Sequence, residues 1–156
     1  KKASVIWDGN LSSTKSMMTK IKEANAVGKV LHIAYTYRPP LESWIDGVIK
    51  RMIKNKGELN RSVPSSVTAD NHIGSYNAVV DTFDKLRSGE LTDKNVKIYL
   101  IDNGLGTGNQ QFMAIPKFEN IKYPSVGELK VLFDKEAKKM YEQGKLKKTE
   151  YDALTG

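Results

Sequence analysis

The pattern of apolar and polar positions along the chain predicts three short strands separated and followed by helices. Apolar runs of the length of a buried strand occupy residues 3–7, 30–35 and 96–101. Elsewhere apolar side chains recur at intervals of three and four, the spacing of one face of a helix. This spacing predicts helices between Ser12 and Gly28, Pro39 and Gly57, Val67 and Arg87, Ser125 and Gly144, and a short one near Thr149 and Asp152.

Residues at the expected helix ends support these boundaries. Ser12, Ser13 or Thr14 can cap the first helix, and Gly28 can end it in the left-handed conformation. Ser125 and Glu128 have the spacing of a capping box. The stripe of the second helix contains apolar residues with Trp44 beside them: Leu41, Ile45, Val48, Ile49 and Met52.

The order of the elements predicts an α/β fold with a small, mostly parallel sheet flanked by helices. Strand, helix and strand within the first 35 residues favour a right-handed βαβ unit, and the continuous apolar run at 30–35 favours a strand buried on both faces. Residues 115–124 are expected to be extended, punctuated by prolines. We expect one domain, an α/β part over residues 1–110 followed by a helical C-terminal extension over 111–156. Because the chain opens at KKASVIW, we also expect a longer parent protein whose upstream part supplies further strands.

Composition narrows the class of protein. The 156 residues are 39% apolar and 28% charged, as in ordinary globular domains, and no apolar run approaches the roughly 18 residues of a membrane span. The absence of cysteine rules out disulfides and cysteine metal sites and fits a reducing compartment such as the cytoplasm. The net charge of +7 suits an anionic partner, whether phosphate, nucleotide or nucleic acid.

Three charged residues are candidates for chemistry. Asp8 follows the first predicted strand, where an acid can hold Mg²⁺ through water or accept a substrate hydroxyl, although Asp-Gly is also a common turn. Arg51 and Arg61 can clamp phosphate oxygens with their rigid forks of donors. Their alternative interpretations are a solvated helix end for Arg51 and a loop charge for Arg61.

Other motifs are set aside. The glycine-rich DNGLGTGN at 102–109 leads to no helical pattern, and no GxxxxGK[ST] occurs, so we predict no ordinary ATP phosphate loop. His32, within an apolar run, favours a core position, and His72 has no partner at metal-ligand spacing. No nucleophile elbow is present. The lysines of 130–148 alternate with acids, as on a solvated helix face.

VIWDGNL at 5–11, the Pro-Pro-led helix ending in IKRM at 49–52, and RSVP at 61–64 resemble the zeta toxin family of P-loop kinases. The similarity covers roughly residues 4–102 and the C-terminal half of that family. It implies a partial P-loop-kinase-like fold, with ATP, Mg²⁺ and a sugar nucleotide such as UDP-N-acetylglucosamine as ligands.

By position, the resemblance implies roles for four residues. Asp8 matches the acidic substrate or Mg²⁺ residue, and Asn10 stands where the family has a substrate-contacting threonine. Arg51 and Arg61 match two arginines that contact the ATP phosphates. Serines occupy the place of a basic residue expected after Asn10. The Walker lysine and the general base belong to the half that this chain does not match, so we predict no catalytic residue or metal-ligand set here and no kinase activity by the chain alone. Either a P-loop lies upstream in the parent protein, which would make the whole a kinase, or the domain is a degenerate relative kept for binding.

Two other hypotheses stay open. The chain can be a non-catalytic module of a larger mobile-element or phage protein that binds nucleic acid or a partner, which predicts a contiguous basic face. It can also be a structural appendage whose helices after Ser125 dock onto the parent. The kinase hypothesis predicts instead that Arg51 and Arg61 converge on a pocket near Asp8.

Overall fold

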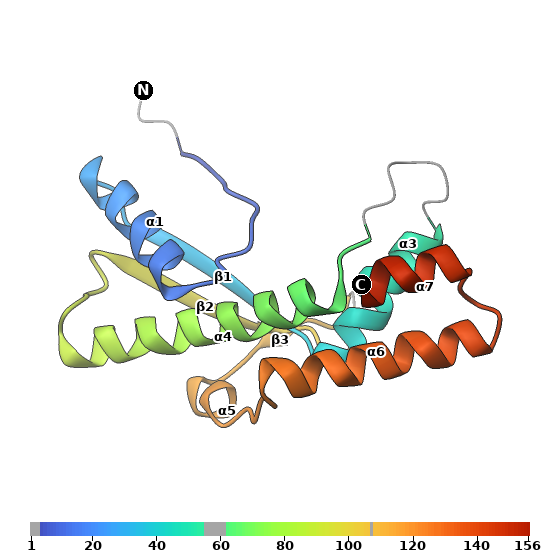
Figure 1. Cartoon of the computed structure of the whole chain (residues 1–156). Helices are drawn as coiled ribbons and strands as arrows, with labels where there is room; N and C mark the ends of the chain where they lie inside the picture. The colour runs from blue at the N-terminus through green and yellow to red at the C-terminus, as the bar shows by residue number, and fades with distance from the viewer. Residues whose placement is uncertain (1–3, 55–61, 107) are drawn as a thin grey trace.

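The computed structural model describes residues 4–54, 62–106 and 108–156, and it is an α/β structure with a small mixed sheet (Figure 1). Strand β1 (Leu31–Tyr37) pairs in parallel with β2 (Val96–Asp102), with Leu31 opposite Val96. The two-residue strand β3 (Gln111–Phe112) pairs antiparallel with the end of β2. The predicted class and the second and third predicted strands are therefore confirmed.

Helices flank this sheet and continue beyond it. They are α1 (Thr14–Ala26), α2 (Pro40–Glu42), the π-helix η1 (Ser43–Ile49), α3 (Lys50–Lys54), α4 (Ser65–Ser88), α5 (Ile115–Glu119), α6 (Val126–Glu142) and α7 (Lys148–Thr155). The Ser13 side chain caps α1 by accepting from the Ser16 N–H at 3.1 Å. The capping box of Ser125 and Glu128 forms as predicted. None of the helices in the described ranges is long and apolar enough to cross a membrane.

The first predicted strand, at residues 3–7, is wrong for the part that the structure describes. Residues 4–8 form no strand, and the side chains of Val5, Ile6 and Trp7 are 65%, 95% and 55% exposed. An apolar run becomes a strand only when its backbone pairs with a neighbour, and no described strand lies beside this one. The predicted βαβ unit at the N-terminus is absent as a result, and the parallel crossover runs from β1 through α4 to β2.

Strand β1 is covered on one face only, which corrects the prediction of burial on both. Ile33 is buried and packs in one cluster with Met17 of α1 and Val79 of α4. The alternate residues His32, Ala34 and Thr36 are exposed. His32 is therefore not a core histidine; its ring stacks on Tyr99 across the sheet, with Nδ1 3.1 Å from the phenolic oxygen.

Residues 115–119 form helix α5 instead of the extended segment expected from the prolines. Pro116 lies in the first turn, where its missing N–H costs nothing. Phe118 is fully buried, and its carbonyl accepts from the Tyr76 hydroxyl at 3.3 Å. A helix of five residues is too short to show an apolar period, so only its packing reveals it.

The core consists of two clusters joined by α4. The first lies between the sheet, α1, α4 and α5, and the second lies between η1, α3, α6, α7 and the start of α4. Trp44 is fully buried in the second cluster, whereas the sequence predicted it beside the apolar stripe of its helix. Its ring stacks on Phe133 with centroids 4.9 Å apart, and its Nε1 donates to the Phe133 carbonyl at 3.2 Å.

Candidate functional site

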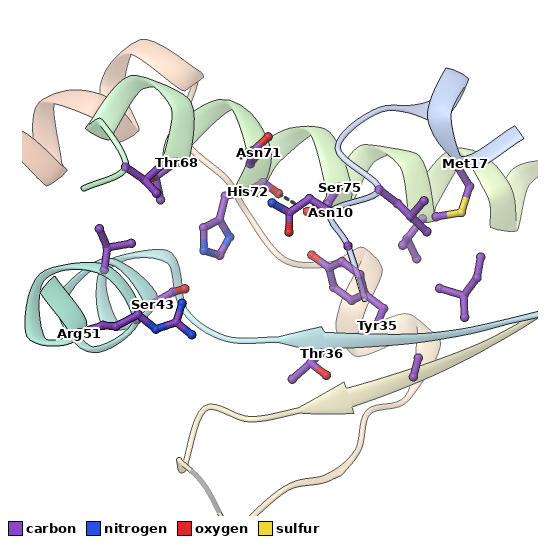
Figure 2. Close-up of a pocket in the computed structure, with 18 residues that line it drawn as sticks. Asn10, Met17, Tyr35, Thr36, Ser43, Arg51, Thr68, Asn71, His72 and Ser75 are labelled. Carbon is purple, nitrogen blue, oxygen red and sulfur yellow. Dashed lines mark hydrogen bonds between the residues drawn. The ribbon is translucent and has the colours of Figure 1, made fainter. Parts of the chain in front are cut away.

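A pocket of about 510 Å³ opens at the junction of the two core clusters (Figure 2). Its walls come from the segment before α1, the end of β1, the η1–α3 helix and the first half of α4. The polar side chains among the lining residues are Asn10, Tyr35, Thr36, Ser43, Arg51, Thr68, Asn71, His72 and Ser75.

The π-turn of η1 positions Arg51. The Lys50 N–H donates to the Ile45 carbonyl, five residues back, which is the wide hydrogen bond of a π-helix. In this wider turn Ser43, Gly47 and Arg51 all reach the pocket. Trp44 anchors η1 to α6 through its hydrogen bond to the Phe133 carbonyl. The Arg51 guanidinium is directed into the pocket, as Figure 2 shows.

Close packing against α4 positions Asn10. A Cβ atom added to Gly74 would lie 2.1 Å from the Ser12 carbonyl oxygen, so only glycine permits this approach. The Thr14 hydroxyl donates to Asp81 of the same helix. The segment before α1 is thereby held along α4, and the Asn10 amide lies beside Ser75 (Figure 2).

Helix α4 contributes a polar row at helical spacing: Thr68, Asn71, His72 and Ser75. The hydroxyls of Thr68 and Ser75 donate to carbonyls of their own chain, those of Pro64 and His72, both at 3.2 Å. His72 extends from the helix toward Arg51 (Figure 2). Burial lowers the pKa of its imidazole, which is therefore neutral at pH 7.

The pocket has a net positive character. Arg51 is the charged side chain among its described lining residues, which include no carboxylate. Nearby charges are paired elsewhere: Asp46 accepts from both Lys50 and Arg38, and these cations hold the pKa of its carboxyl below the usual range. Arg51 forms no ion pair with any described residue. Such an arrangement attracts an anion.

Comparison with known proteins identifies the family. The family model for Zeta toxin matches residues 1–111, more than half of the chain, and every pocket-lining residue lies within that range. The chain belongs to the zeta toxin family. No curated protein and no solved structure matches it.

The zeta toxin resemblance predicts four site residues, and the structure places two of them in the pocket. Asn10 and Arg51 both line the pocket. Asp8 is exposed and is not a lining residue, and the prediction that it follows a strand is wrong, because residues 4–8 form none. Its role as a ligand contact stays a prediction. Arg61 lies outside the described residues, and its predicted convergence with Arg51 stays a prediction.

The polar row of α4 was missed from the sequence. Its signal was present, because the four residues recur at intervals of three, one and three. Polar residues at this spacing are usually the solvated face of a helix. Here they face a pocket because the segment before α1 and the η1–α3 helix lie on either side of α4.

The glycine-rich turn after β2 has no helix directly behind it, as the sequence predicted. It leads to β3 and not to a helix. The Asp102 carboxylate accepts from Lys117 and from the Gly104 N–H, each at 2.9 Å, which lowers its pKa. The described residues also contain no group of three His, Asp or Glu side chains that could hold a metal ion.

The charges on the C-terminal helices are mixed. Lys130 pairs with Asp134 and Lys148 with Asp152, each one turn along its helix. These pairs place acids beside lysines on α6 and α7, as the alternation of lysines and acids in the sequence indicated. Binding to nucleic acid or to a protein partner stays a prediction.

Proposed function

We propose that this zeta toxin domain binds the phosphate groups of a nucleotide or sugar nucleotide in the pocket, with Arg51 as the principal phosphate contact. The observation that carries the proposal is the Arg51 guanidinium directed into a pocket whose described lining has no carboxylate. Arginine presents several donors in a fixed plane and stays charged, which suits phosphate oxygens. Asn10, held across the pocket by the Gly74 contact, supplies an uncharged hydrogen-bonding group for the substrate.

Family membership adds ATP and Mg²⁺ as candidate ligands and Asp8 and Arg61 as candidate contacts. The described residues do not fit a resident metal ion, because no carboxylate lines the pocket and no three-residue ligand group exists among them. We therefore assign no step to a metal. Asp8 directly precedes Gly9, which lines the pocket, and is not itself a lining residue.

We further propose that the 156 residues alone do not transfer phosphate. Phosphoryl transfer needs a lysine and backbone cradle for the phosphates together with arginines. The sequence contains no GxxxxGK[ST], and the glycine-rich turn leads to β3. The pocket can then bind its ligand without completing the reaction.

Calorimetric titration with inorganic pyrophosphate, ATP and UDP-N-acetylglucosamine tests the binding proposal. Arg51→Ala is expected to weaken binding of all three about 10-fold or more, because hydrogen bonds to charged groups contribute roughly 1.5–3 kcal/mol. Lys54→Ala is the matched control, since it removes an exposed cation from the same helix outside the pocket. Equal affinities of Arg51→Ala and Lys54→Ala for pyrophosphate would contradict the proposal.

A further inference from the structure

His72 is the titratable imidazole among the described pocket residues, and the phosphate proposal gives it no role. It lies on α4, in the middle of the pocket wall, and extends toward Arg51 (Figure 2). Neither the sequence motifs nor the family resemblance assigned it a role. Its position on the ligand side of the helix calls for an explanation, because the residues around it belong to two apolar clusters.

The imidazole of His72 has no structural partner. Its ring nitrogens make no hydrogen bond to a described residue, whereas the backbone carbonyl of the same residue accepts from Ser75. Among the described residues, the fully buried side-chain nitrogens and oxygens without a partner belong to Arg38, Asn103 and Tyr123. The unpaired ring nitrogens of His72 are not among them, so they are not fully buried. The ring nitrogens of His72 are therefore open to the pocket, where a ligand can reach them.

The neutral state of this ring selects the kind of ligand group. A neutral imidazole offers one donor and one acceptor. A phosphate at neutral pH can only accept, and it would gain most from a charged histidine, which burial disfavours here. A hydroxyl group can donate to the acceptor nitrogen or accept from the N–H, so it can pair with the neutral ring through either nitrogen.

The remaining lining favours a sugar over a base at this position. Among the described lining residues, Tyr35 is the only Phe, Tyr or Trp. Its ring packs in a T-shaped arrangement with Phe118, with ring centroids 5.4 Å apart. Tyr35 is thus engaged with the core cluster on the sheet. The hydrogen-bonding side chains around His72 instead suit a ring that carries several hydroxyls.

We propose that His72 is a specificity-determining residue that hydrogen-bonds a sugar hydroxyl of the ligand whose phosphate lies at Arg51. This inference rests on the proposed function, because it needs the phosphate site to place the sugar. The sugar can be the ribose of a nucleotide or the second sugar of a nucleotide sugar. Their shared chemistry is a ring that carries hydroxyls and is linked to a phosphate.

The test compares ligands with and without sugars on wild-type protein and three variants. The ligands are inorganic pyrophosphate, UDP and UDP-N-acetylglucosamine; the variants are His72→Ala, His72→Gln and His32→Ala. His72→Ala is expected to weaken a sugar-bearing ligand about 3- to 10-fold, as for a neutral hydrogen bond, and to leave pyrophosphate within about twofold. His72→Gln, which keeps a donor and an acceptor, should recover part of the loss. His32→Ala removes the exposed histidine of β1 and should bind like the wild type.

The pattern of losses separates this inference from the proposed function. Loss with UDP places the ribose at His72, and loss with UDP-N-acetylglucosamine alone places the second sugar there. Equal affinities of His72→Ala and the wild type for both sugar ligands, or an equal loss for pyrophosphate, would overturn the role of His72 while the phosphate site stands. A wild-type protein that fails to bind pyrophosphate would overturn the proposed function and this inference with it.

Discussion

At the scale of single residues, His72 shows how burial decides protonation at the pocket. Its ring lies between two apolar clusters, and the loss of solvent disfavours the charged imidazole. The unfolded chain lacks this effect, so its histidine takes up a proton near its ordinary pKa of about 6.5. The folded and unfolded states therefore bind different numbers of protons in mildly acidic solution.

This difference predicts how stability changes with pH. As pH falls below about 6.5, the unfolded state gains a proton at residue 72 before the folded state does, and the free energy of unfolding decreases. Above the histidine pKa of the unfolded state, the free energy of unfolding keeps its full value. His72→Gln should remove this part of the decrease between about pH 7.5 and pH 5.5, as measured by urea unfolding at each pH. Parallel curves for His72→Gln and wild type would contradict it, with His32→Gln as the control for loss of a histidine.

Asn10 and Arg51 were predicted as site residues from the sequence, whereas His72 was not. Asn10 and Arg51 were found because short motifs around them resemble a family, and both line the pocket. His72 carries no motif, and its environment depends on elements before α1 and after β1. Burial of this kind arises from packing between distant segments, which one sequence does not display.

At the scale of elements, the pocket depends on how two segments dock against their neighbours. The helix after Pro40 was predicted, but its π-turn was not; within that turn Trp44 stacks on Phe133 of α6, a contact between distant parts of the chain. The path of residues 9–12 was likewise not predicted, because it follows from the missing side chain at Gly74. Local spacing thus defines the helices, whereas long-range contacts define the faces they present.

Gly74→Ala tests the docking of the segment before α1. The added methyl cannot coexist with the Ser12 carbonyl at 2.1 Å, so this segment must move away and carry Asn10 out of the pocket. We expect weaker binding of UDP-N-acetylglucosamine, comparable to that of Asn10→Ala, and faster proteolytic cleavage before α1. The pyrophosphate affinity, which depends on Arg51, should change little.

Gly127→Ala is the matched control for this substitution. Gly127 lies in α6 with nothing within 4 Å of an added Cβ, so alanine should keep binding unchanged and stabilise the helix by up to about 1 kcal/mol. If Gly74→Ala binds UDP-N-acetylglucosamine and resists protease as Gly127→Ala does, the close contact at Ser12 does not position Asn10.

At the scale of the whole molecule, one helix connects two cores. Ala69 near the start of α4 belongs to the cluster around Trp44, and Val79 further along belongs to the cluster on the sheet. The fold class, most strands and helices, and several caps followed from the sequence because they depend on local patterns. The strand expected at residues 3–7 did not form, because a strand needs a partner and not only an apolar run.

Because α4 spans both clusters, we expect the chain to unfold in one cooperative transition. Trp44 is fully buried and reports on the second cluster, while Trp7 is 55% exposed, so Trp7→Phe leaves a single buried reporter. In this background, urea unfolding followed by Trp44 fluorescence and by far-UV ellipticity should give the same midpoint. Ile21→Val, a change in the sheet cluster that costs about 0.5–1.5 kcal/mol, should lower both midpoints together. A Trp44 transition that is unchanged by Ile21→Val would show instead that the two clusters unfold independently.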